Sequence, residues 1–228
     1  MSCLNRKYLK DIFGIENASG KERLDYLDFL RGAAMLLVLL HHSNIPNGHW
    51  ILAFHMPLFF LISGYADAHL SHLGISHSKN LADYFWNRFK RLVVPYFLFE
   101  GANLFVWSVS LILQRSWQDV PDALFAIITC QNTDAYTGYY GRLWFLPCMF
   151  VSDIYFYCIK KICKESKIRL LLSAALMLAL SWFTCHILTF RLPFAADTAF
   201  MATAFLIFGF LFEQQITDLL EKKHFCWI

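Results

Sequence analysis

Two ionisable side chains, Arg31 and His42, lie eleven positions apart inside the otherwise apolar run FLRGAAMLLVLLHH. Eleven residues of α-helix turn through about 20° more than three full turns and rise roughly 16 Å, so one helix face would carry both groups. A guanidinium binds phosphates and other anions through a fork of donors. An imidazole can take a proton from a hydroxyl and return it. The pair therefore indicates an anion-binding group and a proton carrier on one helix.

Each of these residues also has a purely structural explanation. Asp28 lies one turn before Arg31, and an ion pair between them would lower the cost of burying either charge. A histidine in a helix interface can simply be hydrogen-bonded there, and the spacing alone does not separate that role from catalysis. His41 lies about 100° round the helix from His42, so we expect His42 and not His41 to share the face of Arg31.

The next apolar segment, FHMPLFFLISGY, contains a second set of informative residues. The connection 43–49 is short and contains Asn, Pro and Gly, which predicts a tight turn and places His55 at a depth similar to that of His42. Pro57 frees a backbone carbonyl within this helix. Gly64 would permit close contact with another helix, which we take as its main role.

Further candidates lie at the ends of apolar segments. Tyr65 follows Gly64, Arg91 precedes VVPYF, and Trp144 opens WFLPCMF. A basic residue or an aromatic at such a position is normally an anchor at the membrane interface. The seven cysteines form no CxxC pair, so we expect neither a disulfide framework nor a zinc site. The sequence has no GxSxG elbow, Walker loop or HExxH motif.

The composition is that of a membrane protein, with 57% hydrophobic, 18% aromatic and only 16% charged residues. We predict an all-α polytopic membrane helix bundle with about six transmembrane helices. A transmembrane helix needs roughly 20 residues to cross a bilayer. The predicted spans are residues 24–42, 50–66, 92–113, 143–159, 170–190 and 192–212. Residues 120–130 are too short to cross and are predicted to be interfacial.

The distribution of Lys and Arg predicts the orientation of these spans. With the N-terminus in the cytoplasm, 17 of the 20 Lys and Arg residues fall on the inner side and three on the outer side. Residues 1–23 contain no signal peptide and form a cytoplasmic N-terminal segment, residues 24–213 form the transmembrane domain, and residues 214–228 form a cytoplasmic tail. The basic cluster 160–169 is interpreted as a topology determinant or a lipid contact, and not as a nucleic-acid site.

Five stretches, taken in order, resemble acyltransferase family 3, the membrane proteins that include fucose 4-O-acetylase-like and other polysaccharide O-acetyltransferases. They are LDYLDFLRGAAMLLVLLHHS, FHMPLFFLISGY, RFKRLVVPYF, LWFLPCMF and FLIFGFLF, and the resemblance covers about residues 24–212. It implies a multi-pass enzyme of the bacterial cytoplasmic membrane. Such an enzyme takes an acyl group from cytoplasmic acetyl-CoA, or another acyl-CoA, to a sugar hydroxyl of a cell-envelope polysaccharide or its lipid-linked precursor.

The resemblance also implies roles for individual residues. The candidate catalytic residues are His42, Arg31 and His55. Arg31 and Arg91 would bind the acyl-CoA donor, and Trp144 and Tyr65 would contact the substrate. His42 would act as the base on the acceptor hydroxyl or would carry the acyl group, and the sequence does not separate these two roles. No metal is expected.

Members of this family usually have more spans in a longer chain, so this sequence resembles a C-terminally truncated member. The missing helices would then be unnecessary or would come from another chain, either a second copy or a different partner. Two other functions fit an intramembrane Arg and His. One is a transporter or flippase, in which they would form a substrate or proton path. The other is a non-catalytic truncated membrane subunit.

Overall fold

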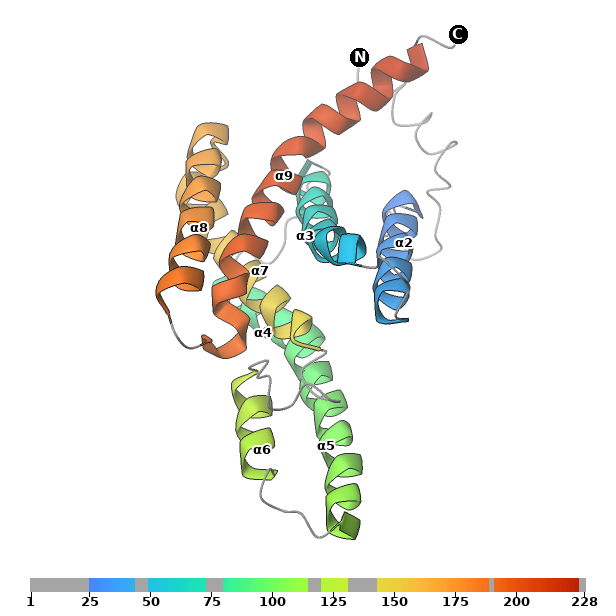
Figure 1. Cartoon of the computed structure of the whole chain (residues 1–228). Helices are drawn as coiled ribbons and strands as arrows, with labels where there is room; N and C mark the ends of the chain where they lie inside the picture. The colour runs from blue at the N-terminus through green and yellow to red at the C-terminus, as the bar shows by residue number, and fades with distance from the viewer. Residues whose placement is uncertain are drawn as a thin grey trace.

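The computed structural model of the protein describes residues 25–43, 49–72, 80–114, 120–130, 143–188 and 191–225, and the regular structure within these residues is helical throughout. Figure 1 shows the arrangement. The elements are α2 (Asp25–His42), α3 (His49–His72), α4 (Leu81–Arg88), η1 (Phe89–Val93), α5 (Val94–Gln114), α6 (Val120–Thr129), α7 (Phe145–Cys163), α8 (Lys167–Ile187), η3 (Pro193–Ala195) and α9 (Ala196–Phe225). The predicted all-α class is confirmed. The calls on residues 1–23 lie outside the described residues.

Three helical stretches among the described residues are long and apolar enough to cross a membrane. They are Leu81–Val109, Lys167–Ile187 and Pro193–Glu213. Helices α2, α3 and α7 would complete the predicted six, but each carries charged side chains that lower its hydropathy. A membrane protein is therefore indicated, whereas the number of six spans and the cytoplasmic N-terminus stay predictions.

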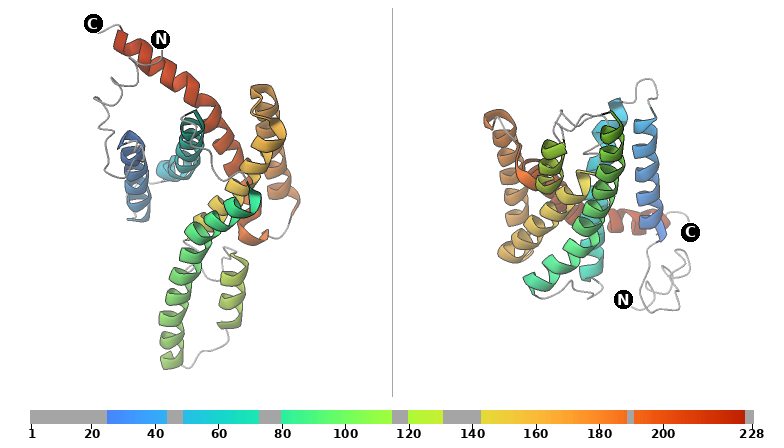
Figure 2. Two further views of the ribbon diagram at one scale, coloured as in Figure 1. Left: turned by 180° about the vertical axis from the view of Figure 1, so that it is seen from behind. Right: turned by 90° about the horizontal axis from the view of Figure 1, so that it is seen from below.

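Helix α9 is the centre of the bundle and packs against α3, α7 and α8 (Figures 1 and 2). Its buried face contains small residues, among them Ala199, Ala202 and Ala204, which let neighbouring backbones come close. The main core also contains Phe156 from α7 and Leu170 from α8. This core holds the C-terminal half of the chain against α3.

Helices α3 and α9 approach each other closely at two glycines, each of which faces the backbone of the other helix. A Cβ added at Gly64 would overlap the carbonyl oxygen of Leu206, and a Cβ added at Gly209 would overlap the carbonyl oxygen of Leu61. Only glycine fits at either position, because the obstructing atoms belong to a backbone and cannot rotate away. The prediction that Gly64 permits close helix contact is confirmed.

Helix α9 lies across α3 at this contact (Figure 2). Gly64 meets Leu206 and Leu61 meets Gly209, and beyond these contacts His69 meets Glu213.

Helix α2 packs against α3, through the buried residues Leu27 and Ala34. Most of its other large apolar side chains are exposed. Helices α4, η1 and α5 form a continuous helix, because each begins at the residue after the previous one ends. The widened turn η1 precedes Pro95, which has no N–H to donate to the carbonyl of Arg91. The N–H of Val94 bonds instead to the carbonyl of Phe89, five residues back.

Candidate active site

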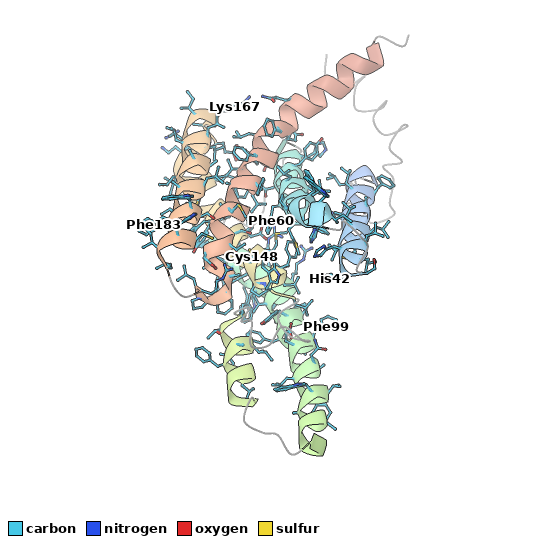
Figure 3. The ribbon with its side chains drawn as sticks, viewed as in Figure 1. His42, Phe60, Phe99, Cys148, Lys167 and Phe183 are labelled. Carbon is cyan, nitrogen blue, oxygen red and sulfur yellow. The ribbon has the colours of Figure 1, made fainter. Side chains whose placement is uncertain are left out.

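Three histidine rings come together where α2 ends and α3 begins. The ring centroids of His41 and His42 are 5.3 Å apart, and those of His41 and His55 are 5.4 Å apart with the planes inclined by only 27°. Figure 3 places His42 at the end of α2 that approaches α3. Histidines of the two helices thus lie at one place, as the sequence predicts for the end of the first helix and the start of the second.

His55 is held in one tautomer by the backbone of its own helix. It is only 1% exposed, and its Nδ1 lies 2.7 Å from the carbonyl oxygen of Ile51. A carbonyl oxygen can only accept a hydrogen bond, so Nδ1 donates the proton. In the neutral ring the lone pair is then on Nε2, which is the form that can accept a proton from another group.

The sequence does not anticipate the part that His41 takes in this group, where its ring stacks on His55. The expectation that His42 shares the face of Arg31 stays a prediction. The His42 side chain is exposed and is tilted against His41. The rotation of α2 about its own axis depends on how α2 packs on α3, and nothing within α2 fixes that rotation.

Arg31 forms the ion pair that the sequence offers as its structural explanation. Its Nη1 lies 3.3 Å from Oδ1 of Asp28, one turn earlier on α2. The Arg31 side chain is nevertheless 47% exposed, so the guanidinium is accessible beside its partner. Both explanations of Arg31 therefore stand, since an exposed pair of this kind contributes little stability and leaves donors available to an anion.

The other candidate residues lie apart from the histidines. Tyr65 is buried towards the far end of α3, where its ring is parallel to that of His69 with centroids 6.3 Å apart. Arg91 is exposed in η1. Trp144 caps the start of α7 and packs against the main core. No described contact joins these three to the histidine group, and their proposed roles stay predictions.

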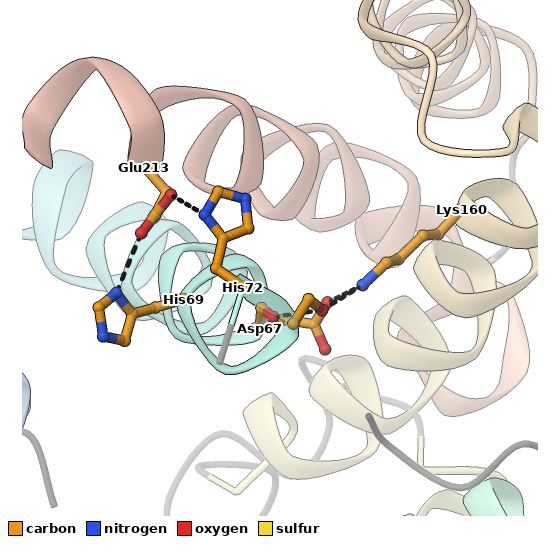
Figure 4. A network of polar contacts seen from close by, with 6 residues as sticks. Asp67, His69, His72, Lys160 and Glu213 are labelled. Carbon is orange, nitrogen blue, oxygen red and sulfur yellow. Dashed lines mark hydrogen bonds and ion pairs between the residues drawn. The ribbon is translucent and has the colours of Figure 1, made fainter. Parts of the chain in front are cut away.

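A second group of ionisable residues, not anticipated from the sequence, joins α3, α7 and α9 (Figure 4). Lys160 of α7 donates to Oδ2 of Asp67 at 2.7 Å and to Oγ of Ser71 at 2.8 Å, both on α3. Its Nζ also lies 4.6 Å from the ring centroid of Phe210 on α9. Lys160, which the sequence groups with the basic cluster 160–169, thus connects three helices.

Two further buried carboxylates, each paired with basic side chains, extend this group. Glu213 of α9 is buried, and its two oxygens lie 3.0 Å from Nδ1 of His69 and 3.5 Å from Nδ1 of His72. Arg88 of α4 lies with its Nε 3.3 Å from Oδ2 of the buried Asp153 on α7. These polar contacts therefore join α3 to α9 and α4 to α7. The partners of the Lys160 and Glu213 pairs are 93 and 144 residues apart in the sequence, so no local pattern indicates them.

Replacing Lys160 by methionine is expected to lower the free energy of unfolding by about 1–3 kcal/mol, because the Asp67 carboxylate, only 14% exposed, would lose its cation. Thermal unfolding of the detergent-solubilised chain measures this. The neighbouring Lys161→Met, at an exposed position, should change stability by less than about 0.5 kcal/mol. Equal effects of the two substitutions would contradict the proposal that the contacts of Lys160 stabilise the bundle.

The helical fold, with polar groups inside and at the ends of apolar helices, defines a membrane protein with a polar site between its helices. The family model of the acyltransferase 3 group, described as an acyltransferase domain, matches residues 24–228. The chain therefore belongs to acyltransferase family 3. No curated protein and no solved structure matches it.

Proposed function

We propose that this protein is a membrane O-acyltransferase that moves an acyl group, in the first instance acetyl, from cytoplasmic acyl-CoA to a sugar hydroxyl. The acceptor would be a cell-envelope polysaccharide or its lipid-linked precursor. Membership of acyltransferase family 3 supports the class of reaction. The observation that carries the proposal is that Arg31 and His42 lie on one unbroken helix, α2, with an anion-binding group towards one end and a proton-binding group at the other.

The proposed reaction requires a base and a group that holds the donor. His42 would take the proton of the acceptor hydroxyl, and the oxygen would attack the thioester carbonyl of the acyl-CoA. The C–S bond then breaks, and the CoA thiolate takes a proton back from His42. If His42 instead carries the acyl group, the same transfer occurs in two steps through an acyl-imidazole. Arg31 would hold a CoA phosphate or the acyl carbonyl through its guanidinium.

The histidines next to His42 suit this chemistry. His55 is buried with its proton fixed on Nδ1, so its ring is a rigid surface against which the His41 ring stacks. His41 in turn contacts the ring of His42. We include His41 in the proposed site as a positioning residue, because it is the ring through which the buried His55 contacts the exposed His42.

The direction of transfer follows from the predicted orientation. The bias of Lys and Arg supports a cytoplasmic N-terminus, with Arg31 towards the cytoplasm and His42 towards the outside. The pair would then span the route from the donor to an envelope sugar. On this proposal the protein is a multi-pass component of the cytoplasmic membrane, and acyl-CoA, a glycan acceptor and membrane lipids are its partners.

Membranes that contain the full chain are expected to transfer radiolabelled acetyl groups from acetyl-CoA to glycan, in an ester linkage that mild alkali releases. Membranes from the same cells without the chain provide the background. Succinyl-CoA is tested in parallel, and the relative rates of transfer from the two donors show which acyl group the protein prefers. Absence of transfer from every acyl-CoA by correctly folded protein would contradict the proposal, and glycan movement across the membrane without acylation would favour a flippase instead.

A further inference from the structure

The turn between α7 and α8 gathers basic side chains that the proposed reaction does not use. Four of them form what we call the α7–α8 basic patch: Lys161, Lys164, Lys167 and Arg169. All four are exposed. Within the described part of the chain, none of the four forms an ion pair. The patch is therefore an unneutralised concentration of positive charge at one end of the bundle.

The neighbouring charges are already engaged elsewhere. Lys160, the fifth basic residue of the cluster, points to Asp67 and Ser71 on α3. Glu165, the acidic residue within the turn, has Oε1 3.5 Å from Nζ of Lys160. The turn thus pairs its carboxylate with the lysine that faces the bundle, and the outward-facing cations form no ion pair with the described residues.

The backbone of the turn brings these side chains together. Lys164 and Glu165 both have left-handed backbone conformations, with φ of 46° and 56°, which glycine adopts more easily than any other residue. The amide of Ser166 bonds back to the carbonyl of Cys163, and Sγ of Cys163 lies 3.3 Å from Oγ of Ser173. A tight, strained turn therefore places the last residues of α7 beside the first residues of α8.

Large apolar side chains alternate with the basic ones. Ile162 is 74% exposed, Ile168 is 72% exposed, and Leu171 and Leu172 continue the exposed apolar surface along α8. Helix α8 is one of the stretches apolar enough to cross a membrane, and the patch lies at its first turn. Figure 3 shows Lys167 at the end of α8, away from Phe60 and Cys148 in the core. The basic patch is thus continuous with the exposed apolar surface of α8.

We propose that the α7–α8 basic patch binds the phosphate of an anionic phospholipid headgroup, with the lipid tails lying along the exposed apolar surface of α8. Basic residues beside a span attract anionic headgroups, and they do so more strongly when several act on one phosphate. We take the occupant to be a membrane lipid because its anionic group and its tails match the two parts of this surface. The proposal is independent of the acyltransferase reaction.

The test offers the purified full chain, in mild detergent, equal amounts of phosphatidylglycerol and phosphatidylcholine with identical acyl chains. Native mass spectrometry counts the lipids that remain bound. The wild type should retain phosphatidylglycerol preferentially. The variant with all four patch residues replaced by glutamine should lose that preference by roughly tenfold or more. A matched control removes four other basic residues, through Arg6→Gln, Lys7→Gln, Lys10→Gln and Lys21→Gln, and should keep the preference.

Three outcomes would overturn the proposal. One is a wild type without preference for phosphatidylglycerol, and another is an equal loss in the matched control, which would indicate attraction by net charge alone. The third concerns a soluble phosphate: acetyl-CoA that displaces phosphatidylglycerol from the wild type, and binds less to the patch variant, would assign the patch to the nucleotide. If the four-residue variant does not fold by circular dichroism, Lys167→Gln/Arg169→Gln should still show a partial loss, and an unchanged preference would overturn the proposal.

Discussion

His42→Ala is expected to reduce acyl transfer at least a hundredfold while the helical content and thermal stability of the protein stay unchanged. General acid–base catalysis by a positioned histidine typically contributes about 10²–10⁴-fold to a rate. His42 is exposed, so its removal leaves no cavity in the core. The measurement is the rate of label transfer from acetyl-CoA in membranes with matched amounts of protein.

His186→Ala is the matched control, since it removes an exposed histidine from α8, where the ring bonds to the carbonyl of Trp182. Its activity should equal that of the wild type. His41→Phe keeps a flat ring against His55 but cannot titrate, so it separates the positioning effect of the ring from proton transfer. Full activity of His42→Ala would remove His42 from the mechanism, whatever the family membership implies.

A single-turnover experiment without acceptor separates the two roles that are open for His42. If the imidazole carries the acyl group, labelled acetyl should remain on the protein and be released by hydroxylamine. If it is a base, no label should remain without the acceptor sugar. Either result is compatible with the loss expected for His42→Ala.

Gly64→Ala is expected to disrupt the bundle, with a loss of at least about 3 kcal/mol of stability and a large fall in the yield of folded protein. The new methyl group would overlap the backbone carbonyl of Leu206, so α3 and α9 would have to move apart along their whole contact. Such movement would also separate Glu213 from its two histidines. Thermal unfolding and size-exclusion chromatography in detergent measure the effect.

The chain supplies controls for this substitution. No atom lies within 4 Å of a Cβ placed at Gly32 or Gly101, so alanine at either position should be neutral or slightly stabilising through its better helix propensity. Gly209→Ala should resemble Gly64→Ala, and the double variant should cost less than the sum of the two because the first already separates the helices. A Gly64→Ala protein as stable as Gly32→Ala would show that the two helices do not pack this closely.

Much of the fold can be predicted because long apolar stretches have few other solutions than membrane helices. The first span was predicted over 24–42 and is observed as α2, Asp25–His42. The second was predicted to end at residue 66, whereas α3 continues to His72. The polar residues Asp67, His69 and Ser71 end the apolar stretch. These residues are nevertheless helical, and their side chains bond to α7 and α9.

The site was predictable only as far as it is local. Arg31 and Asp28 are one turn apart, and the connection after α2 is short enough to bring His55 near the end of α2. The participation of His41 depends on the rotation of one helix against another, and the pairing of Lys160 with Asp67 depends on which helices become neighbours. Neither is encoded in a local spacing, so only the packed bundle reveals them.

The pairing of α3 with α9 has a consequence for the order in which the bundle assembles during synthesis. Glu213 is made 144 residues after its partner His69. At usual rates of translation that interval is on the order of ten seconds. During this time α3 must wait in the membrane with His69, His72 and the groove at Gly64 uncovered. The contact of α3 with α9 is therefore one of the last to form, and a chain that ends before α9 would lack the carboxylate that His69 and His72 bind.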